Sequence, residues 1–391
     1  MKKPQKFKKK KILYIITRLD GGGAQKSVLY SAVNLPRKEY DTFLASGPGG
    51  PLEAHAKSKL KNRFFTIKSL RQRVSVANIP ADILSVFQTY LIIRKIHPDI
   101  IHTNCPKAGI VGRAASILYP RAKVVHTYHG LGFSMYGGIK RFFIFTYIEK
   151  FWAALADKLI FVSQANMNEA ANLGIGGNKK NILLHAGAEF EELKPSFDRQ
   201  KKLASLGIKE DSKVVLGIGN FKPLKNAKEF VLTAAQVIKR MPNVHFLYVG
   251  FGGTDEAKTK TLAKKLGLKK HFSFLGLRHD VRELFAISDI YVSTSLREGL
   301  PIALLEALAY GVPALCYEAD GTSEVLINNQ NGYIFGQGRK DELASKIVKV
   351  LGSESLLNHL KNGAKSFNHQ KYSAQTTVLK QTELYKKLLK K

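Results

Sequence analysis

Cysteine is scarce in this chain: Cys105 and Cys316 are the only two in 391 residues, and they lie far apart with no C-x-x-C spacing. A disulfide framework or a cysteine-based zinc site is therefore not expected, and the composition fits a reducing compartment. Long apolar runs are also lacking, because no stretch approaches the roughly 18 apolar residues of a membrane-spanning helix. The apolar run at residues 12–16 is too short for a signal peptide and predicts a buried strand. We therefore expect a cytoplasmic protein.

Acidic residues are few, 30 against 62 lysines and arginines, which gives a formal net charge of +32. An excess this large acts on partners rather than on the fold. It attracts nucleic acid or an anionic membrane, although a lysine arm can equally be a solvated tail. We find no RNA-recognition, zinc-finger or helix-turn-helix signature, so nucleic acid is not the expected partner. Part of the charge lies in a basic N-terminal arm and a basic C-terminal end, which comprise Lys2, Lys3, Lys6, Lys8, Lys9, Lys10 and Lys11, and Lys386, Lys387, Lys390 and Lys391.

The length of the chain exceeds what one hydrophobic core usually serves, so we expect two domains. Hydrophobic residues make up 45% of the chain and the mean hydropathy is −0.13, which is typical of a folded protein. Short apolar runs alternate with amphipathic stretches, a pattern that indicates α/β units with parallel sheets. Strands are predicted at 12–17, 42–46, 64–68, 99–103, 123–128, 158–163, 213–218, 244–249, 272–275, 289–293, 312–317 and 333–335, and helices at 83–96, 227–240, 255–266, 301–310 and 340–351.

A polar segment at residues 186–200, which contains Pro195, predicts a linker between the two halves. The fold class predicted is α/β, with two doubly wound Rossmann-like domains that face each other across a cleft. The first domain is expected at residues 1–187, with a C-terminal helix at 371–391 packing back on it, and the second at 188–370. In such sheets ligands sit beyond the carboxyl ends of the strands, so the loops that follow the strands are where binding residues are expected.

The most informative stretch is REGLPIALLEALAYGVPALCYEADGTSEVL at residues 297–326, in which Glu298 and Glu306 are eight residues apart. Pro301 suits the first turn of a helix, which places Glu298 in the preceding loop and Glu306 on the second turn. Two carboxylates near a helix N-terminus can accept hydrogen bonds from sugar hydroxyls. The backbone N–H groups of Gly299 and Leu300 face the same space and suit phosphate oxygens. An ordinary amphipathic helix with surface glutamates is the alternative for this spacing taken alone.

The surrounding string, E-G-L-P, then L-E-A-L-A, then G-V-P, resembles the donor-binding segment of retaining GT-B glycosyltransferases, specifically the fourth family. GIGNFKPLKNAKEF at residues 217–230 is similar to the family's strand–loop–helix start that holds the donor diphosphate. Many members carry arginine after the glycine, where this chain has Asn220. Lys225 stands at the position of the family's lysine, and Lys222 is a candidate stand-in for the missing arginine. One or two cations at a helix N-terminus would neutralise a diphosphate and stabilise its departure.

The first half carries the resemblance too. TRLDGGGAQKSVLYSAVNL at residues 17–35 is similar to the family's N-terminal G-G-A-E loop, with Gln25 in place of glutamate, and Gly22 and Gly23 would let the backbone approach a ligand. In DIIHTNCPKAGIVGRAAS, residues 99–116, we expect His102 to end a strand. HTYHGLGFS at residues 126–134 resembles the family's T-x-H-G segment. This implies that His129 lies close to the reacting sugar, where it would hydrogen-bond the donor or position the acceptor.

The resemblance implies transfer from a nucleotide-sugar, with UDP the commonest carrier, to a lipid-linked or polysaccharide acceptor, with retention of anomeric configuration. Such enzymes often build surface glycans such as lipopolysaccharide at the inner membrane face. The sequence has no D-x-D motif, so no metal or other cofactor is expected, and no G-x-x-x-x-G-K-[ST] motif. The implied roles are diphosphate binding for Lys225, sugar binding for Glu298 and ribose binding for Glu306. The alternatives are a nucleic-acid-binding protein and another GT-B enzyme such as a nucleotide-sugar epimerase.

An anionic membrane surface is the partner expected for the basic charge, with the protein peripheral on the inner face of the cell membrane. The stretch KRFFIFTYIEKFWAALA at residues 140–156 is a second candidate contact, because its aromatic side chains suit a membrane interface. The alternative is that this helix packs within the first domain, and we prefer that interpretation.

Overall fold

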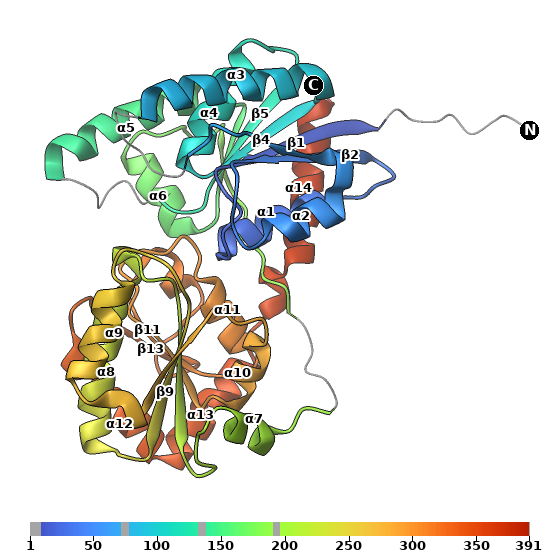
Figure 1. Ribbon diagram of the computed structural model, residues 1–391. Coiled ribbons are helices and arrows are strands. Elements are labelled where there is room, and N and C mark those ends of the chain that lie inside the picture. The colour runs from blue at the N-terminus through green and yellow to red at the C-terminus, as the bar shows by residue number, and fades with distance from the viewer. Residues whose placement is uncertain (1–8, 72–77, 132–137, 191–195, 391) are drawn as a thin grey trace, which may run out of the picture. The chain divides into compact units, whose positions relative to one another are not determined.

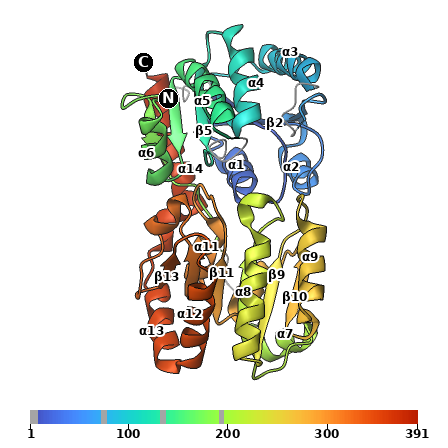
Figure 2. The same cartoon turned by 90° about the vertical axis from the view of Figure 1, so that its left-hand side faces the viewer.

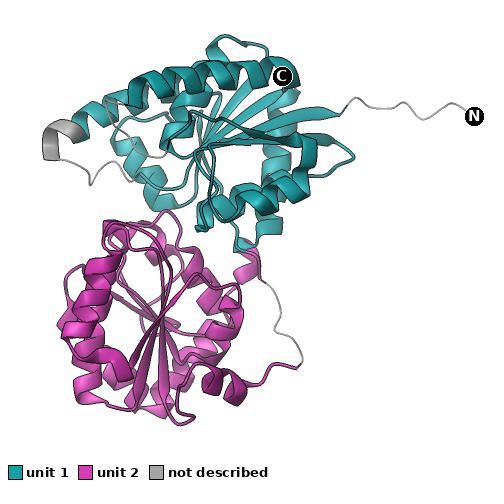
Figure 3. Cartoon of the chain, viewed as in Figure 1, with its two compact units in different colours: residues 1–188, 372–391 teal, residues 189–371 magenta. Residues whose placement is uncertain are grey.

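The computed structural model describes residues 9–71, 78–131, 138–190 and 196–390. The chain forms two compact units (Figure 3). Unit 1 comprises residues 1–188 and 372–391, and unit 2 comprises residues 189–371. Pro195 and most of the basic N-terminal arm lie outside the described residues. Lys10 and Lys11 belong to the first strand, so the arm is shorter than the sequence suggested.

Unit 1 is built on a seven-stranded parallel sheet with the order β3-β2-β1-β4-β5-β6-β7 (Figure 1). The order reverses between β1 and β4, which lie side by side although β2 and β3 come between them in the chain. Strands covered on both faces are expected to be apolar along their whole length, and in β1 every residue from 12 to 16 is buried. The strands are β1 Lys10–Ile16, β2 Tyr40–Ser46, β3 Phe64–Thr66, β4 Ile100–Asn104, β5 Lys123–Tyr128, β6 Lys158–Phe161 and β7 Asn181–Leu183.

Helices cover both faces of this sheet (Figures 1 and 2). Because side chains alternate along a strand, Ile12, Tyr14 and Ile16 of β1 pack with α1, α2 and α14. Leu13 and Ile15 point the other way and pack with α3 and α4. A third cluster joins α5 and α6 to β5 and β6. The helices are α1 Gly23–Asn34, α2 Glu53–Leu60, α3 Ile79–Ile96, α4 Pro106–Ile117, α5 Gly138–Ala154, α6 Gln164–Asn172 and α14 Ala374–Leu389, with a 3₁₀ turn η1 at Lys61–Arg63.

The last helix, α14, is held in unit 1 by a buried polar chain. The Tyr385 hydroxyl donates to the Tyr14 hydroxyl at 3.0 Å, and Tyr14 donates to Gln381 Oε1 at 2.9 Å. Tyr385 also contacts Nδ1 of His102 at 2.5 Å. At the helix end, Lys386 forms an ion pair with Glu39 at 2.8 Å. These contacts explain how a segment that follows unit 2 in the sequence belongs to unit 1.

Unit 2 repeats the architecture with a six-stranded parallel sheet of order β10-β9-β8-β11-β12-β13. Here the order reverses between β8 and β11. The strands are β8 Lys213–Ile218, β9 Val244–Val249, β10 Phe272–Gly276, β11 Ile290–Ser293, β12 Ala314–Tyr317 and β13 Gly332–Phe335. The helices are α7 Arg199–Ser205, α8 Ala227–Arg240, α9 Glu256–Lys265, α10 Val281–Ile287, α11 Ile302–Ala309, α12 Lys340–Gly352 and α13 Glu354–Lys365, and the 3₁₀ turns are η4 Pro223–Lys225, η5 Leu268–Lys270, η6 Asp320–Glu324 and η7 His369–Tyr372.

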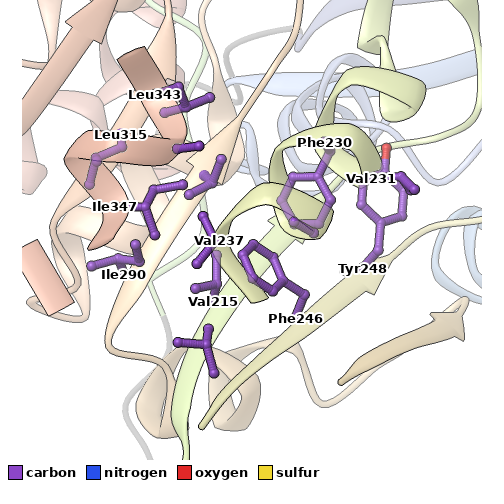
Figure 4. Packing of buried hydrophobic residues seen from close by; sticks show 14 of the residues in the cluster. Val215, Phe230, Val231, Val237, Phe246, Tyr248, Ile290, Leu315, Leu343 and Ile347 are labelled. Atoms are coloured by element: carbon purple, nitrogen blue, oxygen red, sulfur yellow. The ribbon is translucent and has the colours of Figure 1, made fainter. Parts of the chain in front are cut away.

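The core of unit 2 is dominated by α8 and its strands (Figure 4). Phe230, Val231 and Val237 recur at helical spacing and are all buried. The Phe230 ring meets the Phe246 ring of β9 edge-on, with centroids 5.7 Å apart. This strong period is why the helix predicted at 227–240 matches α8.

The predicted fold class, two Rossmann-like α/β domains, is confirmed. Three local differences from the sequence analysis matter below. β4 runs two residues past His102 to Asn104, β7 is a short strand that the sequence analysis did not predict, and Pro301 is the N-cap of α11 rather than a residue of its first turn. Among the described residues, no helix has both the length and the apolar character that crossing a membrane requires.

Candidate functional site

The carboxyl edge of the unit 2 sheet carries most of the predicted site residues. In open α/β sheets the ligand crevice lies where the strand order reverses, which in unit 2 is between β8 and β11. The loops after these two strands are bonded to each other. The Leu296 N–H donates to the Leu224 carbonyl at 2.8 Å, and the Thr294 hydroxyl donates to the Asn226 carbonyl at 3.0 Å. Two loops that are hydrogen-bonded to each other therefore lie at the position where the strand order reverses.

Lys225 and Glu298 meet at this point. The Lys225 ammonium forms a short ion pair with Glu298 Oε1, although the two residues are far apart in sequence. Side chains on both sides are mostly covered, with 29% of Lys225 and 15% of Glu298 exposed. Two residues that the sequence analysis named as donor-binding candidates are therefore in direct contact within unit 2. A partly buried cation beside a carboxylate can exchange that partner for the diphosphate and hydroxyls of a ligand.

Two further loops brace Glu298. Its backbone N–H donates to Asp320 Oδ2 at 2.9 Å, and the other Asp320 oxygen pairs with Arg297 Nε at 3.0 Å. The Gln337 amide donates to the carbonyls of Leu296 and Glu318, at 2.8 and 2.9 Å. The loops after β8, β11, β12 and β13 are therefore tied into one edge. Sequence reasoning missed Asp320 and Gln337, although Asp320 lies inside the motif at residues 297–326.

Asn220 and Lys222 occupy the loop that follows β8. The Asn220 side chain accepts a hydrogen bond from the Lys222 N–H at 3.2 Å, and the Lys222 side chain is exposed. Asn220 thus shapes the loop and brings no charge, so the cations on this loop are Lys222 and Lys225. α8 begins at Ala227, with Asn226 as its N-cap in the left-handed region at a φ of 48°. The positive end of a helix dipole lies next to both lysines and favours an anion.

Glycines allow the loop after β9 to pack closely against the backbone of the loop after β8. A Cβ on Gly250, whose φ is +152°, would lie 1.8 Å from the Gly219 carbonyl oxygen. A Cβ on Gly253, whose φ is +123°, would lie 2.3 Å from the Phe221 carbonyl carbon. Only glycine allows backbones to approach this closely at such φ values. The G-F-G-G stretch at residues 250–253 is therefore part of the scaffold of the β8 loop.

The remaining predicted residues of unit 2 surround the start of α11. Gly299 and Leu300 are buried and directly precede the N-cap Pro301. Glu306 lies on the second turn of the helix and is half-buried. Cys316 on β12 is no candidate nucleophile, because burial and, to a lesser extent, the charge of Glu298 raise the pKa of its thiol. We find no position here for thiolate chemistry.

Gly22 and Gly23 lie at the carboxyl edge of the unit 1 sheet. Gly22 is the N-cap of α1 without a side-chain cap, and Gly23 is the first residue of the helix. This turn follows β1, next to the point where the strand order reverses. There the Thr17 hydroxyl accepts a hydrogen bond from the Ala108 N–H of α4 at 3.1 Å. The predicted glycine loop thus occupies the ligand-binding position of unit 1.

His129 directly follows β5, and its tautomer is set by Asn104 at the end of β4. The Asn104 side chain lies 3.2 Å from the His102 carbonyl. A carbonyl oxygen only accepts hydrogen bonds, so the atom of Asn104 that faces it is the amide nitrogen, and Oδ1 faces away from it. Oδ1 lies 3.0 Å from His129 Nε2, and an oxygen acceptor there requires Nε2 to carry the hydrogen. Burial lowers the pKa of His129 to about 4. The imidazole is therefore neutral at pH 7, with Nδ1 as a hydrogen-bond acceptor.

His129 and Asn104 line a small, partly open pocket within unit 1. Its other polar lining residues include Tyr14, Ser27, Thr127 and Gln381. His102 lies behind the pocket, where its Nε2 contacts the Thr127 hydroxyl at 2.7 Å. Burial lowers the pKa of His102 to about 3, which makes it a neutral structural residue. Sequence reasoning missed Asn104 because neither the range 99–103 nor the choice of His102 as the strand end reached it.

No metal-binding cluster of three or more His, Cys, Asp or Glu side chains is present in residues 9–71, 78–131, 138–190 and 196–390. Of the ten predicted site residues, seven belong to unit 2, and Gly22, Gly23 and His129 belong to unit 1. Each of the two groups lies at the carboxyl edge of its own sheet.

Comparison with known proteins gives matches along most of the chain. A family model described as Glycosyltransferase Family 4 matches residues 21–182, and one described as Glycosyl transferases group 1 matches residues 198–367. An Escherichia coli UDP-Gal:alpha-D-GlcNAc-diphosphoundecaprenol alpha-1,3-galactosyltransferase is 27% identical over 337 residues, which is 85% of this chain and 86% of that protein. A Campylobacter jejuni N,N'-diacetylbacillosaminyl-diphospho-undecaprenol alpha-1,3-N-acetylgalactosaminyltransferase is 28% identical over 76% of this chain and 80% of its own length.

Solved structures share the fold. The Anabaena protein HepE in complex with UDP and glucose superposes with a TM-score of 0.80 at 21% identity, over 97% of this chain and all of that chain (100%). Sucrose-phosphate synthase from Thermosynechococcus elongatus gives a TM-score of 0.81 at 19% identity, over 97% of this chain and 99% of its own.

Proposed function

The chain belongs to the GT-B glycosyltransferases of family 4, and from this premise we propose that it moves a sugar from a nucleotide diphosphate donor, bound by unit 2, to a lipid-linked acceptor. The observation that carries the donor assignment is the Lys225–Glu298 pair at the strand-order reversal of unit 2. It places a cation, a carboxylate and a helix N-terminus together, which are the groups that a sugar diphosphate requires.

Donor binding exchanges the partners of this pair. The Lys225 ammonium passes from Glu298 to the diphosphate, with Lys222 and the N-terminus of α8 beside it. Glu298 is then released to accept hydrogen bonds from the hydroxyls of the donor sugar, while Glu306 holds the ribose hydroxyls and the N–H groups of Gly299 and Leu300 face the phosphates. These assignments explain why the pair is only partly buried.

Transfer proceeds with retention of configuration by attack from the front face. The acceptor oxygen bonds to the anomeric carbon as the bond from that carbon to the diphosphate breaks, and the acceptor proton passes to the departing phosphate oxygen. The protein contributes orientation and charge stabilisation rather than a nucleophile. Lys222, Lys225 and backbone N–H groups stabilise the leaving group without a metal ion.

The acceptor class comes from the relatives. Two of them, from Escherichia coli and Campylobacter jejuni, are named for transfer to sugars on diphospho-undecaprenol. A comparable isoprenoid diphosphate-linked sugar is the acceptor we propose here, in the synthesis of a surface glycan, with the enzyme peripheral on the inner face of the membrane. UDP is the proposed nucleotide because HepE was solved with UDP and because the E. coli relative is named for UDP-galactose.

The donor is identified by thermal unfolding with a panel of nucleotides and nucleotide-sugars, each with and without EDTA. A ligand that binds only the folded protein stabilises it by about 2.7 kcal/mol at 100 times its Kd. We expect UDP and one UDP-sugar to raise the Tm by several degrees, with EDTA making no difference. A Tm shift that needs magnesium contradicts the proposed leaving-group stabilisation. If none of the nucleotides or nucleotide-sugars shifts the Tm, the proposed donor site is contradicted.

Asn104 is proposed as a positioning residue that keeps His129 an acceptor at Nδ1 for a substrate hydroxyl. Asn104→Leu removes the oxygen that accepts the hydrogen bond from His129 Nε2–H. Both neutral tautomers of His129 are then populated, and kcat is expected to fall about tenfold because the substrate is positioned less well. Asn104→Asp restores the acceptor but adds a negative charge, which raises the pKa of His129. Activity of that variant should be near normal at pH 8 and fall as the pH drops through the raised pKa.

The measurements are pH profiles of kcat/KM and ¹⁵N chemical shifts of histidine-labelled protein. The wild type should show a neutral His129 with hydrogen on Nε2 from pH 5 to 8. A merely structural role for Asn104 predicts equal losses in both variants at every pH and no change of tautomer, and that pattern would refute the assignment.

A further inference from the structure

Exposed apolar side chains gather on one part of unit 1. Of the sixteen large hydrophobic side chains exposed among the described residues, eleven lie on α3, on α5 and at the end of α4. α4 contacts both other helices, through extensive packing with α3 and through the Arg113–Glu149 ion pair with α5. The three helices lie side by side on one face of the sheet (Figures 1 and 2). We call this surface the apolar face, and it consists of Ile79, Ile83, Leu84, Phe87, Leu91, Ile117, Leu118, Phe143, Ile144, Tyr147 and Phe151.

α3 buries Ile93 and Ile96 of its last turns in the core of unit 1, but it also exposes a line of large apolar side chains. Ile83 and Phe87, one turn apart, are 66% and 56% exposed, and Ile79 and Leu91 extend the same line. The inward side carries Ser85, which is fully buried. The Ser85 hydroxyl donates to the carbonyl one turn earlier at 2.7 Å and contacts the Ser69 hydroxyl at 2.8 Å. A helix that faces only water is expected to have the opposite polarity.

α5 likewise exposes large apolar side chains, although Ala153 near its end is buried in the core of unit 1. Tyr147 is 68% exposed, and Phe143 and Phe151 lie one turn to either side of it. The inward side carries Thr146 and Glu149, both buried. Glu149 pairs with Arg113 at 3.3 Å and accepts a hydrogen bond from the Tyr128 hydroxyl at 2.9 Å. The stretch that we expected to pack within the first domain does pack there, through Thr146, Glu149 and Ala153, but it leaves Phe143, Tyr147 and Phe151 exposed.

The charges around the apolar face indicate which kind of partner it can contact. The described residues of α3 and α5 include two acids, and both are paired with cations: Asp82 with Lys107 at 2.8 Å and Glu149 with Arg113. Exposed cations border the face, namely Arg94 and Lys95 on α3, Arg121 after α4 and Lys150 on α5. A second copy of the chain would bring the same charge, +32 in total, against itself. An apolar centre with a cationic border, in which both acids of α3 and α5 are paired with cations, matches the surface of an anionic bilayer.

We propose that the apolar face docks on an anionic lipid bilayer, with α3 and α5 lying at the level of the headgroups and their aliphatic and aromatic side chains in the acyl boundary. The bordering arginines and lysines contact the phosphates. The use of this docking, to bring unit 1 to a lipid-linked acceptor, rests on the proposed function, but the docking itself does not.

Trp152, the single tryptophan of the chain, makes α5 its own reporter. Its ring lies 5.1 Å from the ring of Phe151, which belongs to the apolar face. Full-length protein is mixed with vesicles of phosphatidylcholine containing either no phosphatidylglycerol or about 30%, with and without bromine on the acyl chains. We expect the tryptophan emission to shift to the blue and to be quenched by the brominated lipid in the anionic vesicles. Binding without a shift or quenching would mean that the N-terminal arm alone holds the protein, which overturns the proposal.

The matched variants are Ile83→Ser with Phe87→Ser on α3, and Leu379→Ser as the control. Leu379 lies on α14, across the sheet, and is also strongly exposed, at 62%. Sedimentation with anionic vesicles should show the partition coefficient of the α3 double variant at least tenfold lower and that of the control unchanged. Equal binding by all three proteins overturns the proposal, as does a wild-type dimer in light scattering that the α3 variant converts to monomer.

Thermal shifts with nucleotide-sugars separate this inference from the proposed function. The α3 double variant should keep the wild-type shift, because it leaves unit 2 unchanged. A wild-type protein that binds vesicles without responding to any nucleotide would leave the docking standing and remove the proposed donor site. The reverse result, a nucleotide response without vesicle binding, would remove the docking alone.

Discussion

Lys225→Met should lower kcat/KM for sugar transfer about 10²- to 10³-fold, equivalent to about 3–4 kcal/mol of transition-state stabilisation. Methionine keeps the length of the side chain and removes the charge that we assign to the leaving diphosphate. The loss should fall mostly on kcat, because negative charge develops on the diphosphate as the glycosyl bond breaks. Steady-state kinetics with the donor identified by thermal shift measure the effect.

A structural role for the Lys225–Glu298 pair is tested by combining Lys225→Met with Glu298→Gln. If the pair serves only stability, the double variant removes both charges and recovers the Tm and the activity together. If both residues bind donor, the Tm recovers and activity falls further. Lys239→Met is the control, because Lys239 is exposed in the last turn of α8, at the opposite end of the helix. Full activity of Lys225→Met would refute the diphosphate assignment.

Glu306→Gln should raise the donor KM about 100-fold, because hydrogen bonds to a charged partner contribute about 1.5–3 kcal/mol each. Glu306 lies on the second turn of α11 and is half-buried, whereas Glu298 lies in the loop that precedes this helix. The assigned partner is the pair of ribose hydroxyls, so the effect should depend on their presence. A 2′,3′-dideoxy nucleotide should bind the wild type weakly and bind the variant no worse.

The losses from Glu306→Gln and from removal of the ribose hydroxyls should therefore not add. This non-additivity is the decisive result, since it isolates the contact between the Glu306 carboxylate and the two hydroxyls. Titration calorimetry of the normal and dideoxy nucleotides against both proteins completes the cycle. Glu354→Gln provides the control, because Glu354 is an exposed acid in the first turn of α13 in the same unit. Equal losses for both nucleotides in Glu306→Gln would show that Glu306 acts on the fold of the site and not on the ribose.

Local sequence patterns predicted the elements well where they were long and periodic. The period of Phe230, Val231 and Val237 defined α8 to the residue, because a helix buries one side over several turns. β7 was missed because it has three residues, all only half-buried. The strand predicted at 99–103, with His102 taken as its end, continues to Asn104 although Thr103 and Asn104 are polar. Both are nevertheless strand residues, since their backbones pair with β1 and β5.

The candidate site was predicted from the sequence in part. Lys225 and Glu298 lie in the loops after β8 and β11, and His129 directly follows β5, so strand-end loops and the motif resemblance were enough to single them out. Asn104 contacts His129 from the end of β4, Asp320 contacts Glu298 from the loop after β12, and Gln337 ties neighbouring loops together, but no sequence spacing connects these residues. Their partnership depends on which strands are neighbours in the sheet, a property that the sequence analysis did not establish.

The sequence by itself determined the α/β character and the family, because these depend on short-range periodicity and on motifs. Only the tertiary structure decided that the loops after β8 and β11 meet, since that depends on the point at which the strand order reverses. It also decided which side of α3 and α5 faces outward. A helical period marks two unlike sides, but only the structure shows that Ser85 and Glu149 are buried within unit 1 while Ile83, Phe87 and Tyr147 are exposed.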